Sequence, residues 1–279
     1  MKKIIRLLSQ LAGTSLSLLV TSISKLRLGD DFNKSFLAAF MQTGEVISYK
    51  EYNIKIVAPN RINRYRIRTF RIKEPATIEW IELMEPSTVF WDIGANIGLY
   101  SILAAKAKGC NVFAFEPSVF NLESLVRNIH NNGLHTQVVI IPVALSNANG
   151  VNTFHLSSTE WGGALSTFQE NYDQYGEVMT PICEYRIPGL TLDDVVESLR
   201  IPTPDYIKLD VDGIEHLILA GGRKILRDAK SVLVEINDNL TEQSSHSSKL
   251  LKESGLTLLR KDPINGGPGQ YNQWWERLS

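Results

Sequence analysis

The residues with the clearest chemical pattern follow a short apolar run at Val89–Trp91. Asp92 ends this run, Gly94 comes two residues later, and Gly98 opens a segment with helical periodicity. Glycine lets the backbone approach a nucleotide closely, and the start of a helix presents free N–H groups. In dinucleotide enzymes such a turn holds a pyrophosphate. An acid at this turn instead favours a ligand with a cationic end, such as the amino and sulfonium groups of S-adenosylmethionine.

A second acid, Glu116, ends the next apolar run, 24 residues after Asp92. A carboxylate at this place can accept hydrogen bonds from both ribose hydroxyls of a nucleoside. Pro117 then stops the strand. In a doubly wound sheet the ligand lies across the carboxyl ends of the strands, so we expect the turn at Ala144 and Leu145 to lie near the adenine.

Acidic residues also follow two later apolar runs. Asp210 ends one run, at the sheet edge where the sulfonium methyl group of S-adenosylmethionine would lie, and Glu235 ends another. The candidates for a general base, in no fixed order, are Asp210, Asp212, Glu215, Glu235 and His216. Asp212 or Glu215 could instead cap the helix that follows. Asp210, Glu235 and Asn237 could alternatively hold a divalent cation through oxygen ligands, but no histidine or cysteine supports a metal and we expect none.

These residues need elements that bring them to one edge, and the pattern from Pro75 onward supplies them. Strands are expected at 88–93, 111–115, 138–144, 206–210 and 231–236, with a short extra strand at 150–155. Helices are expected at 76–84, 99–108, 119–131, 191–199, 214–226 and 241–254. Residues 157–186 are poorly patterned, which is typical of lids and binding loops. Continuous apolar strands alternating with amphipathic helices predict an α/β fold with a Rossmann-like, doubly wound, mostly parallel sheet.

The first 72 residues predict an extension with helices and a small β-sheet. The uncharged run that begins at Leu7 predicts an amphipathic helix with its leucines inward, packed on the domain or lying on a membrane surface. A second helix is expected at 30–42. From Val46 to Lys73 the pattern alternates, which predicts an antiparallel sheet that carries Arg64, Arg66 and Arg68 on one face. That face is expected to be a solvated edge or an anion-binding surface.

Charge divides the chain of 279 residues in the same way. Residues 1–75 contain 14 Lys or Arg and 5 Asp or Glu, whereas the remainder contains 15 and 25. The basic part could face its own acidic neighbour, an anionic substrate or an anionic membrane. Cys110 and Cys183 lack the number and spacing of a disulfide framework or metal site, which suits a reducing cytoplasm.

In order and spacing, the motifs of residues 72–260 resemble those of the FkbM-type methyltransferases, a branch of the Rossmann-like class I methyltransferases. The resemblance rests on the stretches Lys73-Glu74-Pro75, Asp92-Ile-Gly-Ala-Asn-Ile-Gly98, Phe115-Glu116-Pro117, Ala144-Leu-Ser146, Ile207-Lys-Leu-Asp210-Val-Asp212-Gly213-Ile-Glu215 and Val234-Glu235-Ile236. It implies that Asp92, Gly94, Ala95, Asn96 and Gly98 line the methionine end of S-adenosylmethionine, and that Glu116 binds the ribose. It divides the chain into an N-terminal extension at 1–72 and a methyltransferase domain at 73–279.

The resemblance implies O-methylation of a hydroxyl on a sugar, glycan or polyketide-like small molecule. Two alternatives stay open: a NAD-dependent oxidoreductase, against which Asp92 and a missing middle glycine argue, and a non-catalytic scaffold that keeps a cofactor site. The basic charge is confined to the N-terminal part, so nucleic acid is not expected as a partner. We expect a cytoplasmic protein, with peripheral membrane contact through the N-terminal helix as an option. The oligomeric state and the acceptor stay undetermined by the sequence.

Overall fold

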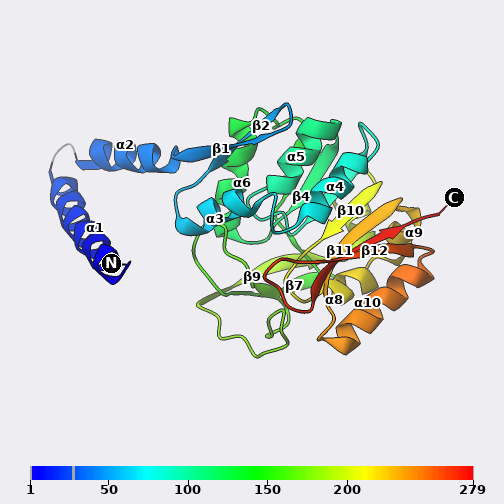
Figure 1. The fold of residues 1–279 in the computed structure, drawn as a ribbon. Helices are drawn as coiled ribbons and strands as arrows, with labels where there is room; N and C mark the ends of the chain where they lie inside the picture. Colours follow the sequence, from blue (N-terminus) through cyan, green and yellow to red (C-terminus); the bar gives the residue numbers. More distant parts are fainter. Residues whose placement is uncertain (1, 27–28, 279) are drawn as a thin grey trace.

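The computed structural model describes residues 2–26 and 29–278, and its centre is a seven-stranded sheet (Figure 1). The strands lie in the order β12-β13-β11-β10-β3-β4-β5. Their bounds are β3 Val89–Ile93, β4 Asn111–Phe115, β5 Val138–Ile141, β10 Tyr206–Leu209, β11 Ser231–Asn237, β12 Thr257–Pro263 and β13 Gln270–Glu276. The five strands from β5 to β11 are parallel, and β13 pairs antiparallel with both β11 and β12. This is the Rossmann strand order with an antiparallel pair at one edge.

Helices cover both faces of this sheet, which confirms the predicted doubly wound α/β fold. The helices are α4 Pro75–Leu83, α5 Leu99–Lys108, α6 Val119–Asn131, α7 Leu192–Leu199, α8 Glu215–Ala220, α9 Arg223–Asp228 and α10 Thr241–Glu253. Alternate strand residues enter two separate cores: Phe90 and Val112 pack with α4, α5 and α6, whereas Trp91 and Phe113 pack with α7 to α10. Both faces of each central strand are therefore apolar, as in buried parallel sheets generally.

Glycines interrupt the single helix that the sequence predicts at 214–226. The chain instead forms α8 and α9, separated by Gly221 and Gly222. A Cβ on Gly221 would lie 2.5 Å from the Ser146 carbonyl oxygen, and one on Gly222 would lie 2.5 Å from Cδ1 of Leu192. The break thus lets the backbone pass close to two neighbouring segments.

A second, smaller sheet lies beside the carboxyl ends of the parallel strands. It contains β6 Ala144–Leu145, β7 Gly150–Leu156, β8 Thr167–Phe168 and β9 Cys183–Leu190, in the order β6-β9-β7-β8. The extra strand predicted at 150–155 is confirmed as β7. The strand predicted at 138–144 is divided between β5 and β6, because Pro142 between them has no N–H to donate.

The N-terminal part begins with two helices, α1 Lys2–Ser24 and α2 Gly29–Met41, which extend away from the sheet (Figure 1). The expectation of inward leucines on the first helix is wrong for the described side chains, because Leu11, Leu18 and Leu19 are all exposed. The side chain of Leu8, also expected inward, lies outside the described residues. Within residues 2–26 and 29–278, no helix has the length and apolar character needed to cross a membrane.

The antiparallel sheet predicted from Val46 to Lys73 is present only in the first half of that stretch. β1 Gly44–Tyr49 and β2 Tyr52–Val57 form the expected antiparallel hairpin, and Ile54 and Ile56 join the core beneath α5 and α6. Residues 61–69, predicted as strand, form helix α3 Arg61–Thr69. The side chain of Asn60 caps this helix by accepting a hydrogen bond from the Asn63 N–H at 2.9 Å.

The arginines of α3 therefore share no strand face. Residues two apart on a helix project roughly 200° apart around its axis, so Arg64 and Arg66 point in different directions. Arg64 lies near Glu45, 3.7 Å away, whereas the Arg66 Nε–H donates to the Gly162 carbonyl oxygen at 2.9 Å. Arg66 thus lines the cavity at the carboxyl ends of the parallel strands.

Candidate functional site

The carboxyl ends of β3, β4 and β10 open into one cavity of about 620 Å³. This volume is within the range of small-molecule and cofactor sites. Of the residues predicted from the sequence, those that line the cavity are Gly94, Ala95, Asn96, Glu116, Pro117, Ala144, Leu145, Asp210, Asp212 and Glu235. The topology of the sheet therefore brings segments more than 100 residues apart to one place.

The glycine loop after β3 is shaped by a close backbone approach. Gly94 has φ +82°, and its N–H and that of Ala95 both donate to the Phe115 carbonyl oxygen at 3.0 Å. A Cβ at position 94 would lie 1.8 Å from the Asp210 carbonyl oxygen. Only glycine fits this turn, which places Asn96 on the cavity wall.

Glu116 lies at the end of β4 with its carboxylate held by the loop. It is 4% exposed and accepts hydrogen bonds from the backbone N–H groups of Asn96 and Ser118, both at 2.8 Å. Burial raises the pKa of Glu116 to about 7, against the lowering effect of these hydrogen bonds. The carboxylate is therefore pre-oriented at the cavity wall, at the position expected for a ribose ligand.

Asp92 lies beneath the loop rather than on the cavity surface. Its carboxylate accepts a hydrogen bond from the Ser101 hydroxyl at 2.5 Å, and it is 1% exposed. Burial raises its pKa, with the charge of Lys208 opposing this effect. Gly98 is similarly structural in position: it has φ +84° and precedes α5, where a Cβ would meet Leu125 at 2.4 Å.

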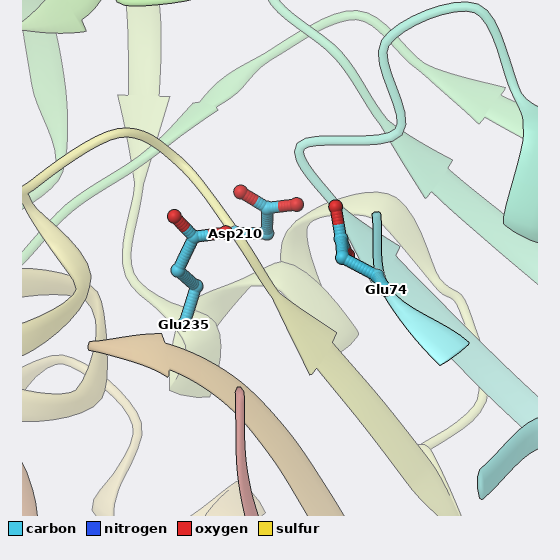
Figure 2. A group of neighbouring side chains, drawn as sticks. All are labelled: Glu74, Asp210 and Glu235. Atoms are coloured by element: carbon cyan, nitrogen blue, oxygen red, sulfur yellow. The ribbon is translucent and has the colours of Figure 1, made fainter. Parts of the chain in front are cut away.

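Three carboxylates meet at the far end of the cavity. Glu74, Asp210 and Glu235 offer oxygen atoms that all lie within 4.8 Å of one another (Figure 2). The Lys208 ammonium lies 2.7 Å from Asp210, and the Lys73 ammonium lies 3.2 Å from Glu74. Glu74 is not among the site residues predicted from the sequence, although it stands in the Lys73-Glu74-Pro75 stretch that supports the family resemblance.

The two lysines divide the protonation states of this cluster. Burial alone would raise the pKa of Asp210, but the charges of Lys208 and Lys73 outweigh it and lower this pKa to about 2. Glu235 is buried, and burial together with the charge of Asp210 raises its pKa well above the usual range. One Oε of Glu235 has no hydrogen-bond partner among the described residues. Of these two carboxyls, Asp210 is therefore the one that stays ionised, and Glu235 is the one that takes up a proton more readily.

Asp212 combines access to the cavity with a pKa near neutrality. It has φ +62° and accepts a hydrogen bond from the Leu165 N–H at 2.7 Å. Burial and the neighbouring charge of Asp210 raise its pKa to about 6. Glu215 instead closes its own turn by accepting from the Val211 and Gly213 N–H groups, at 3.0 and 3.1 Å, and burial raises its pKa to about 7.

Two other candidates lie apart from the lining of the cavity as the structure describes it. His216 is on α8, with its ring 6.1 Å from that of His246, and burial lowers its pKa. Asn237 donates to the Gln174 carbonyl oxygen at 2.9 Å and lies beside a smaller hollow. In the oxygen cluster next to Asp210 and Glu235, the third member is Glu74.

A loop from the poorly patterned region covers the cavity. The Gly163 carbonyl oxygen accepts from the Asn96 side-chain amide at 2.8 Å, and the Gly162 N–H donates to the Asn121 side chain at 3.0 Å. The same loop receives the hydrogen bond from Arg66. These contacts join the glycine loop, α6 and α3, so part of the poorly patterned stretch 157–186 lines the cavity.

Fold and site together define a Rossmann-like class I methyltransferase: a parallel sheet whose first strand leads into an acid-glycine loop and whose second strand ends in a buried glutamate. Residues 92–256 match the methyltransferase FkbM domain, and the chain belongs to this family. It is therefore a methyltransferase, which decides against the NAD-dependent oxidoreductase and the scaffold alternatives.

Two relatives of the chain are named as methyltransferases. The chain is 29% identical over 194 residues to the hexuronic acid methyltransferase AglP of Haloferax volcanii, covering 69% of this chain and 73% of that one. It is 28% identical over 172 residues to the 2-O-methyltransferase NoeI of Sinorhizobium fredii, covering 56% and 66%. Among solved structures, M. jannaschii TYW2 in complex with AdoMet is 14% identical, with a TM-score of 0.44 and coverage of 85% and 87%.

Proposed function

We propose that this protein transfers a methyl group from S-adenosylmethionine to a hydroxyl of a sugar or sugar-containing small molecule. The observation that carries the proposal is a single cavity that joins the glycine loop and Glu116 to a weakly acidic carboxylate, Asp212. The names of two relatives, which specify a hexuronic acid and a 2-O position, support a sugar hydroxyl over a polyketide hydroxyl.

The cavity fits S-adenosylmethionine at three places. We assign Glu116 to the ribose hydroxyls, and apolar side chains that include Phe115, Leu145 and Phe168 line the region proposed for the adenine. We assign Asn96 to the cationic methionine end, because it lines the cavity and its buried side-chain oxygen has no hydrogen-bond partner among the described residues. We assign Gly94 and Ala95 to the same end.

The donor supplies an electrophilic methyl on sulfur, and the protein positions the acceptor and removes its proton. We propose Asp212 as the general base. A carboxylate with a pKa of about 6 is ionised at neutral pH while keeping appreciable basicity. Asp210, with a pKa of about 2, is a much weaker base, and the raised pKa of Glu235 disfavours the carboxylate form that a base needs. As the hydroxyl oxygen forms its bond to the methyl carbon, the carbon–sulfur bond breaks and the proton passes to Asp212.

We propose that the reaction needs no divalent cation. The ammonium groups of Lys73 and Lys208 already pair with Glu74 and Asp210, and the raised pKa of Glu235 disfavours a third negative charge. A cation among these oxygens would meet two fixed positive charges. The cluster therefore has the charge balance of a closed ionic network.

The test is a transfer assay with S-adenosylmethionine and a panel of neutral and acidic monosaccharide glycosides, followed by mass spectrometry. Addition of one methylene mass to a glycoside, with S-adenosylhomocysteine in equal amount, is the expected result. Calorimetric binding of S-adenosylmethionine without turnover on any glycoside in the panel would contradict the sugar assignment.

We further propose that the protein is cytoplasmic and touches a membrane surface through α1 and α2. Leu11, Leu18 and Leu19 of α1 and Phe36 and Leu37 of α2 are exposed. The sequence adds three cations within the first six residues, a combination typical of interfacial helices. Sedimentation with vesicles rich in phosphatidylglycerol is expected, with the Leu18→Glu, Leu19→Glu double variant staying in the supernatant. Equal partition of both proteins would contradict this assignment.

A further inference from the structure

One wall of the cavity is built from segments that lie outside the family-matched residues 92–256. Helix α3 and the residues after it contribute Arg66 and Lys73, and the turn between β12 and β13 contributes Asn265. Asn265 connects the two segments through two hydrogen bonds. Its backbone N–H donates to the Lys73 carbonyl oxygen at 3.3 Å, and its side-chain amide donates to the Ile72 carbonyl oxygen at 2.6 Å. The residues assigned to the cofactor all lie within the matched segment, and none of them belongs to this wall. Because none of its residues is assigned to the cofactor, this wall can contact the acceptor together with Asp212.

Arg66 is the distinctive charge of this wall. Lys73 pairs with Glu74 and Lys208 pairs with Asp210, whereas Arg66 forms no ion pair within residues 2–26 and 29–278. Its Nε–H is used by the Gly162 carbonyl oxygen, which fixes the side chain and leaves the two terminal nitrogens without a hydrogen-bond partner in the same residues. A guanidinium group held in this way is pre-organised for a planar anion.

From this geometry we propose that Arg66 binds a carboxylate of the acceptor, so that the preferred substrate is an acidic sugar of the uronic acid type. The inference rests on the proposed function and narrows its substrate class. A carboxylate suits the site better than a phosphate, because three acids lie near Arg66. Its charge lowers the pKa values of Glu116, Asp210 and Asp212. A second negative charge on the ligand would be repelled by these acids.

The test compares matched pairs of acceptors that differ only at C6: glucuronide and glucoside, galacturonide and galactoside, mannuronide and mannoside. The wild type is expected to favour the acidic member of at least one pair by roughly 10- to 150-fold in kcat/KM, the factor for hydrogen bonds to a charged group. In Arg66→Gln this preference disappears, mainly through KM. Arg68→Gln, an exposed arginine on the same helix, is the matched control and keeps it.

Two binding measurements separate the acceptor from the cofactor, whose methionine end also carries a carboxylate. Titration of the uronide into protein saturated with S-adenosylhomocysteine is expected to give heat with the wild type and none with Arg66→Gln. The affinity for S-adenosylmethionine is expected to stay the same in both. A loss of cofactor affinity equal to the loss of acceptor preference would overturn the inference and assign Arg66 to the cofactor.

The remaining outcomes distinguish this inference from the proposed function. Methylation of neutral and acidic sugars at equal rates by the wild type overturns the acidic preference and leaves sugar methylation standing. Methylation of none of the six glycosides, with the cofactor still bound, overturns the proposed function and this inference together.

Discussion

Replacing Glu116 by glutamine tests the proposed role of this residue in cofactor binding. A carboxylate offers about four lone-pair positions, and the N–H groups of Asn96 and Ser118 occupy two of them. A weaker contact from Asn121, at 3.4 Å, uses a third. About one strong position remains for a ribose hydroxyl. Losing this charge-assisted hydrogen bond costs about 1.5–3 kcal/mol, so the affinity for S-adenosylmethionine should fall roughly 10- to 150-fold.

The pKa of Glu116 gives the same experiment a second readout. With a pKa of about 7, the acceptor form of the carboxyl rises from about a tenth at pH 6 to about nine tenths at pH 8, so wild-type affinity should rise about tenfold. Calorimetric titration across this range should show the rise, and Glu116→Gln should show none. Glu123→Gln, on the partly exposed face of α6, is the matched control. Unchanged affinity in Glu116→Gln, or a pH dependence that persists in it, would refute the assignment.

Four other perturbations test the general base, the glycine loop, the core and the carboxylate cluster. Asp212→Asn should lower kcat about 10²- to 10⁴-fold, and wild-type kcat should fall as the pH drops through about 6, because the base becomes protonated; pH-rate profiles check both. Gly94→Ala should abolish cofactor binding in calorimetry, since its Cβ would lie 1.8 Å from a carbonyl oxygen, whereas Gly133→Ala, with open space around it, should bind normally. Trp275 is fully buried in the core, so Trp275→Ala should lower the free energy of unfolding by about 3–5 kcal/mol, measured by urea denaturation. Dialysis against EDTA should leave kcat unchanged, and restoration of a lost activity by Mg²⁺ would contradict the closed ionic network.

The sequence predicts the parallel sheet well because each central strand is a continuous apolar run between strong helix and turn signals. The strand prediction is wrong at residues 61–69 for a local reason. The arginines there alternate as in a strand, and the stretch is too short for helical periodicity to be recognised. The signal that favours the helix is one side chain, Asn60, whose capping hydrogen bond is visible only in the structure.

The site is predicted in part for a similar reason. Residues at strand ends are brought together by topology, so Glu116, Asp210 and Glu235 follow from the pattern. The direction of a side chain does not, and Asp92 turns beneath the loop toward Ser101. A lysine at position 208 is unexpected in an apolar strand, and its ion pair with Asp210, 2.7 Å away, explains its presence. Glu74 precedes the sheet in the chain, so its contact with the other acids depends on tertiary packing.

The position of β13 has a consequence for how the protein is made. This strand comes last in the sheet's sequence order, yet it lies between β11 and β12 and hydrogen-bonds to both. Until residue 276 has been synthesised, the apolar β11 has an open edge. At the usual rate of synthesis, residues 238–276 take about 2–8 seconds. Once β11 has left the ribosome, it presents a template for strand pairing with other chains until β13 has paired with it, a recognised route to aggregation. Chaperone dependence of the soluble yield should therefore centre on these last segments of the sheet.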